Sequence, residues 1–463
     1  MRLWVRGAEG AAAEGRVLQR LEAGESRENR ETRKIRRPPA RARPVSCFAD
    51  GHGDTRHRDR RLRHGTAGQA AAIYLARQGH RVRVYERCEK LGPVGAGILL
   101  QPTGMSVLAD LRLFDRALAC GAPVHRLVGT NLAGRSVMDM RYRDLDPDWF
   151  GLGMQRGALF ELLKSGFAQQ DDIVTGAEMI GVSGDGRGLR DAHGGVHGPF
   201  DLIVAADGAA SALRKALMPH VRDRLYPLGA VWCLCADPAR RFDGQLSQRY
   251  ELARRMCGVL PVGRLPGEGE EAHRVSFFWS LRGDALAQWP EQRFEVWKED
   301  VRRYWPEAAE LLDDKSSDVQ FARASYRDVV MRRPHSGRVV FLGDAAHAMS
   351  PQLGQGANMA LLDAQALAAA LLRAATIEDA LAGYTRERRA HVPIYQFISR
   401  WLTPLFQSDY DTVARLRDAL FGPLGRAPIL RGEMLKVLAG VKYGWFGRLR
   451  PAVRDVVEEA ARS

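Results

Sequence analysis

The hydrophobic and polar positions of this chain follow two different periods, and both occur between residues 338 and 373. An apolar run over 339–342 has the continuous hydrophobicity of a strand buried in a parallel sheet. A glycine-rich loop follows, and then apolar residues return at helical spacing, at Met359, Leu362, Ala366 and Ala370. The pattern predicts a strand, a loop and a helix. Asp344 would stand at the carboxyl end of the strand, where open α/β sheets bind nucleotide cofactors.

Three more segments continue this α/β pattern. A helix is predicted over 66–78, and residues 81–86 alternate as a strand. Residues 202–206 form another buried-strand run, which ends in Asp207 before Ser211 starts a helix. Between these segments, a loop-like stretch over 91–104 with four glycines and two prolines leads into a further predicted helix.

From about Leu225 to Gln320 the pattern changes. Short apolar or alternating runs over 231–235, 257–262 and 275–281 are separated by loops rich in Gly, Pro and charged residues, which predicts an antiparallel sheet. Its aromatic side chains would suit an apolar ring, although such residues more often simply fill a core; they are Trp232, Phe277, Phe278 and Trp279. A helix is predicted around 287–312.

After about Arg389 the chain is helical, aromatic and basic. Such a tail can cap another domain, form a dimer contact, or lie on a membrane surface. The sequence leaves these alternatives open.

Length and composition set the broad class. A chain of 463 residues can bury a large core and should hold two or three units. No apolar run approaches the roughly 18 residues of a membrane span, and no secretory signal is evident. The cysteines lack C-x-x-C spacing, so we predict no metal site and a reduced, cytoplasmic setting; they are Cys47, Cys88, Cys120, Cys233, Cys235 and Cys257.

The net charge of +14 is concentrated at the N-terminus. Residues 1–64 hold 17 Lys and Arg against 9 Asp and Glu, a net +8 that leaves +6 for the rest. This segment lacks sustained periodicity and is predicted to be disordered. An arginine-rich arm that binds RNA is the weaker alternative. We therefore predict no nucleic-acid partner.

The same segment interrupts a nucleotide-binding pattern. Gly65 and Gly68 fit the second and third glycines of G-x-G-x-x-G, but Arg63 holds the first position. The run at 55–63, TRHRDRRLR, is unsuited to a buried strand. Displaced by one nucleotide, the codons for 56–64 can spell a good strand and glycine turn, and a start codon can overlap His52. We hypothesise that residues 1 to about 64 are out-of-frame or upstream translation.

The loop around residue 355 has chemical consequences. Gly354 and Gly356 let the backbone approach a flat ligand, since no Cβ intervenes. The helix that opens near Asn358 directs free N–H groups and its positive dipole end at that ligand. A reduced flavin, which carries negative charge, would be favoured there, and Asp344 would accept hydrogen bonds from ligand hydroxyls. From the residues alone, an ordinary glycine-rich corner explains the pattern equally well.

The run GDAAHAMSPQLGQGANMALLDA over 343–364 resembles the flavin-binding signature of the class A FAD-dependent monooxygenases, which include p-hydroxybenzoate, salicylate and ubiquinone-biosynthesis hydroxylases. The resemblance implies that Asp344 binds the ribityl chain of FAD and that the loop from Pro351 to Asn358 lies along the isoalloxazine ring. His347 belongs to the GDAAH turn and is expected to be structural.

Further motifs extend the resemblance. Glu86 stands 21 residues beyond Gly65, about the spacing at which a carboxylate reaches the adenosine ribose. The segment ending in Gln101-Pro102, the arginine of MQR at 156, and the pattern around Asp207 are similar to family motifs that contact FAD. The full set of expected FAD contacts is Gly65, Ala67, Gly68, Glu86, Arg87, Gln101, Arg156, Asp207, Gly343, Asp344, Pro351, Gly354, Gln355, Gly356, Ala357 and Asn358.

The expected fold class is α/β: a Rossmann-type FAD-binding domain with an inserted antiparallel β-sheet substrate domain and a C-terminal helical region. The predicted boundaries are 1–64 for the basic segment, 65–222 and 326–390 for the two parts of the FAD-binding domain, 223–325 for the substrate domain, and 391–463 for the helical region.

The resemblance implies an FAD-dependent monooxygenase that uses NADPH or NADH and O2. It would insert one oxygen atom, through a flavin C4a-hydroperoxide, into an electron-rich aromatic or polyene-like small molecule. The sequence names no catalytic base. Alternatives are a flavin-dependent reductase of the same fold, and a scaffold that fails to hold FAD because Arg63 replaces the first glycine. Substrate identity, the choice between NADH and NADPH, and the oligomeric state do not follow from the residues.

Overall fold

A computed structural model describes residues 44–49, 65–89, 96–289, 294–315, 321–425, 427–445 and 447–451. The chain divides into two compact units, Met1–Arg41 and Ala42–Ser463, and every described residue lies in the second. The run at 55–63 and the first-glycine position at Arg63 lie outside the described residues.

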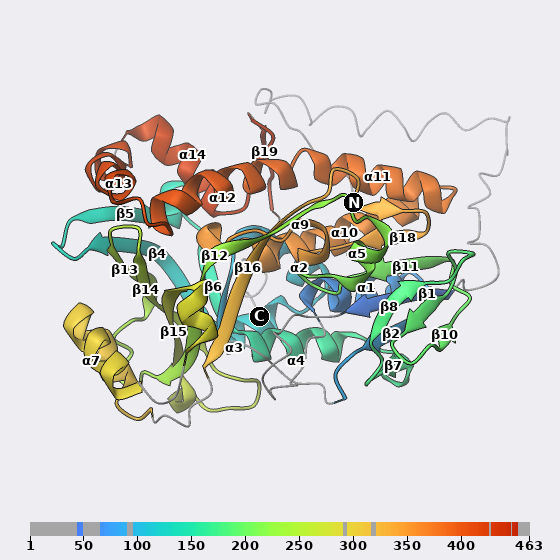
Figure 1. The fold of residues 1–463 in the computed structure, drawn as a ribbon, viewed down its shortest axis with the longest axis horizontal. Coiled ribbons are helices and arrows are strands. Elements are labelled where there is room, and N and C mark those ends of the chain that lie inside the picture. The colour runs from blue at the N-terminus through green and yellow to red at the C-terminus, as the bar shows by residue number, and fades with distance from the viewer. Residues whose placement is uncertain are drawn as a thin grey trace, which may run out of the picture. The chain divides into compact units, whose positions relative to one another are not determined.

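A six-stranded sheet carries the nucleotide-binding pattern (Figure 1). Its order is β17 (His335–Ser336), β18 (Val339–Phe341), β11 (Leu202–Ala205), β1 (Pro44–Ala49), β2 (Arg81–Glu86) and β7 (Ile173–Val174). All neighbours are parallel except β17 and β18. Since β2, β11 and β18 run parallel, their carboxyl ends bring Glu86, Asp207 and Gly343 to one edge of the sheet.

Strand alternation gives this sheet two cores. Val82 and Val84 point toward helices α1 (Thr66–Arg77), α4 (Arg156–Gly166) and α10 (Gly356–Arg373). Tyr85 points the other way, toward α5 (Ala212–Leu217) and a small sheet of β8 (Met179–Val182), β9 (Leu189–Asp191) and β10 (Val196–His197). Alanines fill one face of α1, so that α1 and α10 pack closely.

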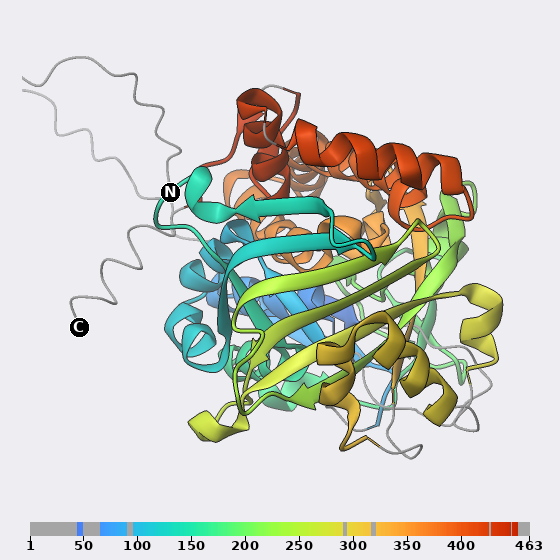
Figure 2. The ribbon, with the colours of Figure 1, turned by 90° about the vertical axis from the view of Figure 1, so that its left-hand side faces the viewer.

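A nine-stranded sheet forms the second layer. Its main path is β16 (Ala322–Val330), β12 (Arg222–Ala236), β15 (Arg274–Arg282), β14 (Arg255–Gly263), β13 (Gly244–Glu251), β4 (Ala122–Asn131), β6 (Gly151–Gln155) and β3 (Gly97–Leu100), and β5 (Ser136–Arg141) pairs with β4. Neighbours are antiparallel except β13 and β4. Figure 2 shows its strands side by side, with α7 (Phe294–Tyr304) in front of them.

The two faces of this sheet differ in what covers them. Phe277 and Trp279 pack against Trp297 of α7, at ring-centroid distances of 6.0 and 6.1 Å. Trp232 and Phe278 point to the opposite, inner face. The remaining short helices are α2 (Pro102–Asp110), α3 (Phe114–Cys120), α6 (Gly283–Ala287), α8 (Pro306–Ala309) and α9 (Asp344–His347).

The C-terminal part is helical. It holds α11 (Ile377–Arg389), α12 (Val392–Phe406), α13 (Asp411–Leu424) and α14 (Pro428–Leu438), followed by β19 (Lys442–Tyr443) and β20 (Gly447–Arg448). Figure 1 shows these helices together along one side of the two sheets. In the described part of the chain, no helix has the length and hydropathy needed to cross a bilayer.

The structure confirms the predicted α/β fold with a second, largely antiparallel sheet and a helical C-terminus. Two expectations are wrong. Residues 44–49 form a strand within the segment expected to be disordered, and this strand takes the central place in the parallel sheet. The second sheet is also not confined to 223–325, because β3 to β6 supply strands from residues 97–155.

Candidate functional site

Three segments meet at Gly343. A Cβ added to Gly343 would lie 3.1 Å from the Cβ of Ala67 in α1 and 3.3 Å from the Cβ of Ala360 in α10. The residue also has a positive φ of 57°. Glycine is therefore required here for both space and backbone conformation.

A buried carboxylate holds this turn. Asp363 Oδ2 accepts hydrogen bonds from the Gly343 backbone N–H at 2.7 Å and pairs with His347 Nε2 at 2.6 Å, while Oδ1 accepts from Arg388 Nε at 2.7 Å. Burial acts to raise the pKa of Asp363, but the charges of His347 and Arg388 outweigh it and lower the pKa to about 2. His347 is thus part of the scaffold under the turn, as expected from the GDAAH motif.

Asp344 stands on the open side of the same turn. Its side chain is exposed at the first residue of α9, and its Oδ1 lies 3.9 Å from the Cβ position of Gly356. Gly356 is the first residue of α10, and Gly354 before it adopts the left-handed conformation with open space beside it. The carboxylate and the positive end of an 18-residue helix therefore face the same place.

Asn358 fastens the loop to β3. Its Oδ1 accepts a hydrogen bond from the Gln101 backbone N–H at 2.8 Å, and its Nδ2 donates to the carbonyls of Leu99 and Gly354, both at 3.2 Å. A Cβ on Gly104 would lie 2.1 Å from Asn358 Oδ1, so only glycine fits there. The Asn358 side chain therefore positions the loop, with its amide group engaged by protein atoms.

Several buried polar atoms at this corner lack a partner. Most buried polar groups in proteins are hydrogen-bonded, so an unpaired cluster marks a place for a ligand or water. Within the described part of the chain, the unpaired atoms at the site are Glu86 Oε2, Gln101 Nε2, Thr103 Oγ1, Asp207 Oδ1 and Gln355 Oε1. Four of these residues are predicted site residues, and Thr103, which follows the Gln101-Pro102 motif, was not among the expected FAD contacts.

The two acids at the strand ends are fully buried. Burial raises the pKa of Glu86 to about 7, although the Cys88 backbone N–H donates to its Oε1 at 3.0 Å. Burial likewise raises the pKa of Asp207. Each acid keeps one buried oxygen without a partner, which is placed to form a hydrogen bond with a ligand hydroxyl.

Arg214 links the segment after Asp207 to the turn at Gly343, since its side chain also donates to the carbonyl of Ala209 at 2.6 Å. It is buried, and it donates to the carbonyl of Ala345 at 2.7 Å and to Asp223 at 2.8 Å. Ser211 caps α5 by accepting from the Arg214 backbone N–H at 2.9 Å. The arginine belongs to the motif around Asp207, but its structural role could not be inferred from sequence spacing.

A segment from the far end of the chain closes the corner. We call residues 437–442 the C-terminal strap. Gln355 Nε2 donates to the Leu438 carbonyl at 2.7 Å, and a Cβ on Gly440 would lie 2.4 Å from Thr103 Oγ1. His391 Nε2 lies 3.0 Å from the Gly440 carbonyl oxygen. Nothing in the sequence pattern indicated that this segment lies on the glycine-rich loop.

The other predicted residues occupy the periphery of this corner or the adjoining helix starts. Gly65 precedes α1 in an extended conformation, with Ala67 and Gly68 buried in the first turn. Pro351 begins a short 3₁₀ turn, and Ala357 lies in the first turn of α10.

Two predicted arginines lie further out. Arg87 has Nη1 at 3.8 Å from Glu178 Oε1. Arg156 is exposed at the start of α4, and its backbone N–H donates to the Ala96 carbonyl at 3.0 Å.

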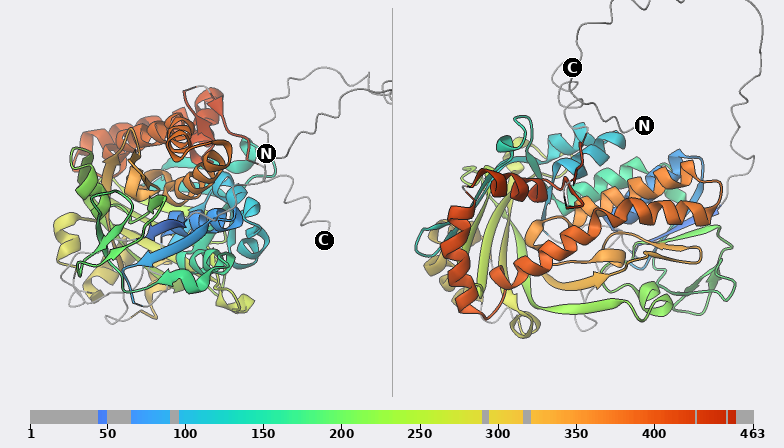
Figure 3. Two further views of the ribbon diagram at one scale, coloured as in Figure 1. Left: turned by 90° about the vertical axis from the view of Figure 1, so that its right-hand side faces the viewer. Right: turned by 90° about the horizontal axis from the view of Figure 1, so that it is seen from above.

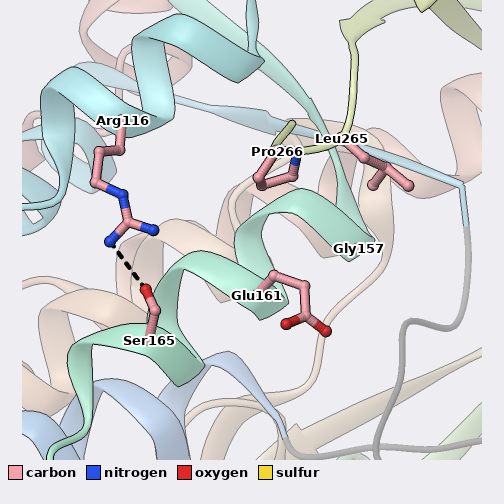
Figure 4. Close-up of a pocket in the computed structure, with 6 residues that line it drawn as sticks. All are labelled: Arg116, Gly157, Glu161, Ser165, Leu265 and Pro266. Carbon is pink, nitrogen blue, oxygen red and sulfur yellow. Dashed lines mark hydrogen bonds between the residues drawn. The ribbon is translucent and has the colours of Figure 1, made fainter. Parts of the chain in front are cut away.

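A surface hollow of ≈ 400 Å³ lies beside α4 and is separate from this corner (Figure 4). Arg116 donates to Ser165 at 3.0 Å across one side of it. Its lining residues are Arg116, Gly157, Glu161, Ser165, Leu265 and Pro266, and none is a predicted site residue.

The inner face of the nine-stranded sheet presents an aromatic group. The rings of Trp232 and Phe278 are 4.7 Å apart, and Trp232 Nε1 donates to Tyr326 Oη at 3.3 Å. Burial raises the pKa of Tyr326 to about 12, and the charge of Arg156 acts in the opposite direction. The group shares a buried cluster with Phe406 of α12, so it lies on the face of the sheet opposite to α7.

A model of the FAD binding domain family matches residues 64–394. The chain belongs to the class A FAD-dependent monooxygenases. Aurachin C monooxygenase/isomerase of Stigmatella aurantiaca is 28% identical over 333 residues, which cover 70% of this chain and 83% of that protein. 6-Methylpretetramide 4-monooxygenase of Streptomyces rimosus is 29% identical over 319 residues, 65% of this chain and 72% of that protein.

A solved structure supports the fold of this class A monooxygenase. Klebsiella pneumoniae HpxO, complexed with FAD and uric acid, superposes with a TM-score of 0.70 at 21% identity, over 86% of this chain and 97% of that one. The chain is an FAD-dependent monooxygenase of the hydroxylase group, and FAD is its cofactor.

Proposed function

We propose that this monooxygenase adds one oxygen atom from O2 to an electron-rich aromatic or heteroaromatic small molecule, with NADPH or NADH as the electron donor. The ring of the substrate would lie between the glycine-rich loop and the inner face of the nine-stranded sheet, against Trp232 and Tyr326. The hydrogen bond of 3.3 Å between these two side chains fixes an apolar surface with a polar edge. A planar substrate with one polar group suits such a surface.

The observation that carries the proposal is the coincidence of unpaired buried atoms with residues expected to hold FAD. Glu86 would accept hydrogen bonds from the adenosine ribose, and Asp344 from the ribityl hydroxyls. The first turn of α10, with glycines at 354 and 356, would face the ring system. The residues present therefore fit FAD, which supplies the redox chemistry when it is bound.

Within this arrangement the chain's own side chains orient and exclude water. Gln101 is fixed through its Oε1, which accepts from Tyr142 Oη at 2.6 Å, so its unpaired Nε2 is held in one direction. The strap covers the loop from the other side through Gln355. Both contacts would keep the ring site rigid, as oxygen transfer without loss to water requires.

The ligand and the names of three similar proteins support a ring compound as substrate. The HpxO structure contains uric acid, a planar nitrogen heterocycle, and the curated relatives above are named as monooxygenases of aurachin C and 6-methylpretetramide. We infer that this chain also takes a ring compound.

The test measures oxidation of NADPH and of NADH by the FAD-loaded enzyme across phenols, aromatic acids, indoles, quinolones and polyenes, under ¹⁸O2. The expected result is substrate-stimulated oxidation and a product that has gained one labelled oxygen. A product that has gained two hydrogens instead would establish the reductase alternative. A protein that takes up no FAD would establish the defective-scaffold alternative. Arg63, at the position of the first glycine, would then be the first residue to replace.

A further inference from the structure

The C-terminal helices carry a large share of the exposed apolar side chains. Sixteen large apolar side chains are exposed among the described residues, and nine of them lie between residues 397 and 445. All four aromatic members of the set are among these nine. Scattered exposed leucines are ordinary, but a concentration of this kind marks an interaction surface.

The side chains form two groups, one centred on α12 and one on α13. Phe397 and Trp401 are one helical turn apart on α12 with ring centroids 6.1 Å apart, and the ring of Trp445 lies 5.7 Å from Phe397. On α13, exposed leucines recur at every fourth position. We define the C-terminal apolar surface as Phe397, Trp401, Leu416, Leu420, Leu424 and Trp445.

The two helices form one piece of structure. Buried Phe406 of α12 contacts Phe421 of α13, with ring centroids 5.8 Å apart. In the right-hand view of Figure 3, the orange-red and red helices of this region follow one another around one end of the ribbon. Trp401 and Trp445 remain 67% and 64% exposed, so the residues that the structure describes leave these two rings uncovered.

The surface around these residues is positive. Residues 392–451 contain nine Lys and Arg against four Asp and Glu. Each of the four acids is already engaged by a basic side chain. In the part of the chain that the structure describes, Arg415, Arg448 and Arg450 are exposed and have no carboxylate partner.

We propose that the C-terminal apolar surface docks the enzyme on an anionic lipid bilayer. Exposed tryptophans and arginines without a carboxylate partner in the same C-terminal segment match the headgroup region, where amphipathic rings and cations are both favourable. Trp401, Trp445 and the leucines of α13 would enter the boundary between headgroups and acyl chains, and α12 and α13 would lie in the plane of the membrane.

Charge also separates a bilayer from a second copy of this chain as the occupant. A two-fold dimer places the same patch against itself, so the unpaired arginines of both copies would face one another. Like charges brought together at an interface cost several kcal/mol. On an anionic bilayer, each of these arginines instead makes the free energy of binding more favourable.

The test is sedimentation of the full-length, FAD-loaded protein with vesicles of phosphatidylcholine, alone or mixed with phosphatidylglycerol. Wild-type protein should bind the mixed vesicles more tightly, and added salt should weaken that binding. Replacing both tryptophans, Trp401→Ala with Trp445→Ala, should lower the partition constant by about tenfold. The matched control is Leu372→Ala on α10, which removes a side chain that is 70% exposed elsewhere.

A charge pair completes the test, because the basic residues before 64 would also attract anionic lipid. Arg415→Glu should weaken binding to mixed vesicles, whereas Arg190→Glu, an exposed arginine of β9 with the same charge change, should not. Three results would overturn the proposal: no vesicle binding, equal binding by the tryptophan variant, or a wild-type dimer that the tryptophan variant dissociates. None depends on turnover, so the outcome is independent of the proposed substrate.

Discussion

The carboxylate of Asp363 accepts a hydrogen bond of 2.7 Å from the backbone N–H of Gly343, 20 positions earlier in the chain. The bond joins the third turn of α10 to the corner at which β18 ends. One fully buried acid thereby sets the geometry of the turn that presents Asp344, although both carboxylate oxygens of Asp363 are bound by protein groups.

Replacing Asp363 by Asn should destabilise the fold strongly. The change leaves the Arg388 guanidinium buried without its counter-charge, which costs about 3–5 kcal/mol, and removes the carboxylate partner of His347. Urea unfolding at neutral pH measures the loss, and the FAD content of the purified variant should fall with it. The pKa of Asp363 is depressed to about 2, so its contribution is complete above the unfolded value of about 4 and is lost as pH falls toward 2. The variant should lack this acid-dependent step; unchanged stability would contradict the network.

Glu86→Gln should have opposite effects on the empty and the loaded protein. Burial raises the pKa of Glu86 to about 7, so the folded empty protein loses stability as pH rises from about 4 to 7. At pH 8 and without FAD, the free energy of unfolding of the glutamine variant should therefore exceed that of the wild type by roughly 3 kcal/mol. It should also bind FAD more weakly, because it lacks the carboxylate. Flavin titration measures the affinity for FAD, and urea unfolding measures the stability. Glu161→Gln, at an exposed position of α4, is the control.

The contact of the strap with the loop can be isolated by two glycines. Gly440 and Gly444 both have positive φ, at 76° and 57°, so alanine costs about 1–2 kcal/mol of backbone strain at either position. Only at Gly440 would the added Cβ also press on Thr103 and Gln355. Gly440→Ala should therefore lower FAD retention several-fold, whereas Gly444→Ala should lose stability alone. Equal flavin retention in the two variants would show that the strap does not act on the site.

Trp232 and Tyr326, on the inner face of the nine-stranded sheet, should affect the binding of substrate and not the binding of FAD. Trp232→Phe is expected to lower kcat/KM about tenfold, with FAD content unchanged, because a hydrogen-bonded ring at the substrate surface is lost. Tyr326→Phe should likewise lower kcat/KM, through a higher KM. Trp279→Phe makes the same exchange on the opposite face of the sheet, where it contacts α7, and should change stability without changing KM.

The reading-frame hypothesis for residues 1–64 stays a prediction. The family match begins at residue 64, so the expected first-strand position falls outside it. Sequencing of the encoding DNA should reveal a displaced frame that spells a strand and a glycine turn before Gly65. An uninterrupted frame in related genes that carries the same arginine run would contradict it.

Much of the FAD-binding fold could be predicted because its signals are local. The alternating strand that ends in Glu86, the apolar run that ends in Asp207, and the glycine loop before α10 each combine a period with a terminal residue of known chemistry. The faces of the second sheet could not be assigned in this way. Phe277, Phe278 and Trp279 are consecutive and equally apolar, and only the packing of α7 decides which side is core.

Contacts between distant segments escaped prediction for a related reason. The position of Asn358 at a helix start predicts a ligand contact, yet its amide group binds the carbonyl of Leu99 in β3, 259 residues away. No sequence pattern relates Thr103 to Gly440, because their contact depends on the path of the whole C-terminal region. Strand β1 was missed because six residues with one charged neighbour on either side carry little periodicity of their own.

The strap has a consequence for how the protein is made. Leu438 and Gly440 lie more than 80 positions after Gln355, to whose side chain they are joined or packed. A chain emerging from the ribosome folds from its N-terminal part onward. The cofactor pocket is therefore finished only when nearly the entire polypeptide has been synthesised, and flavin capture must be a late event in biogenesis.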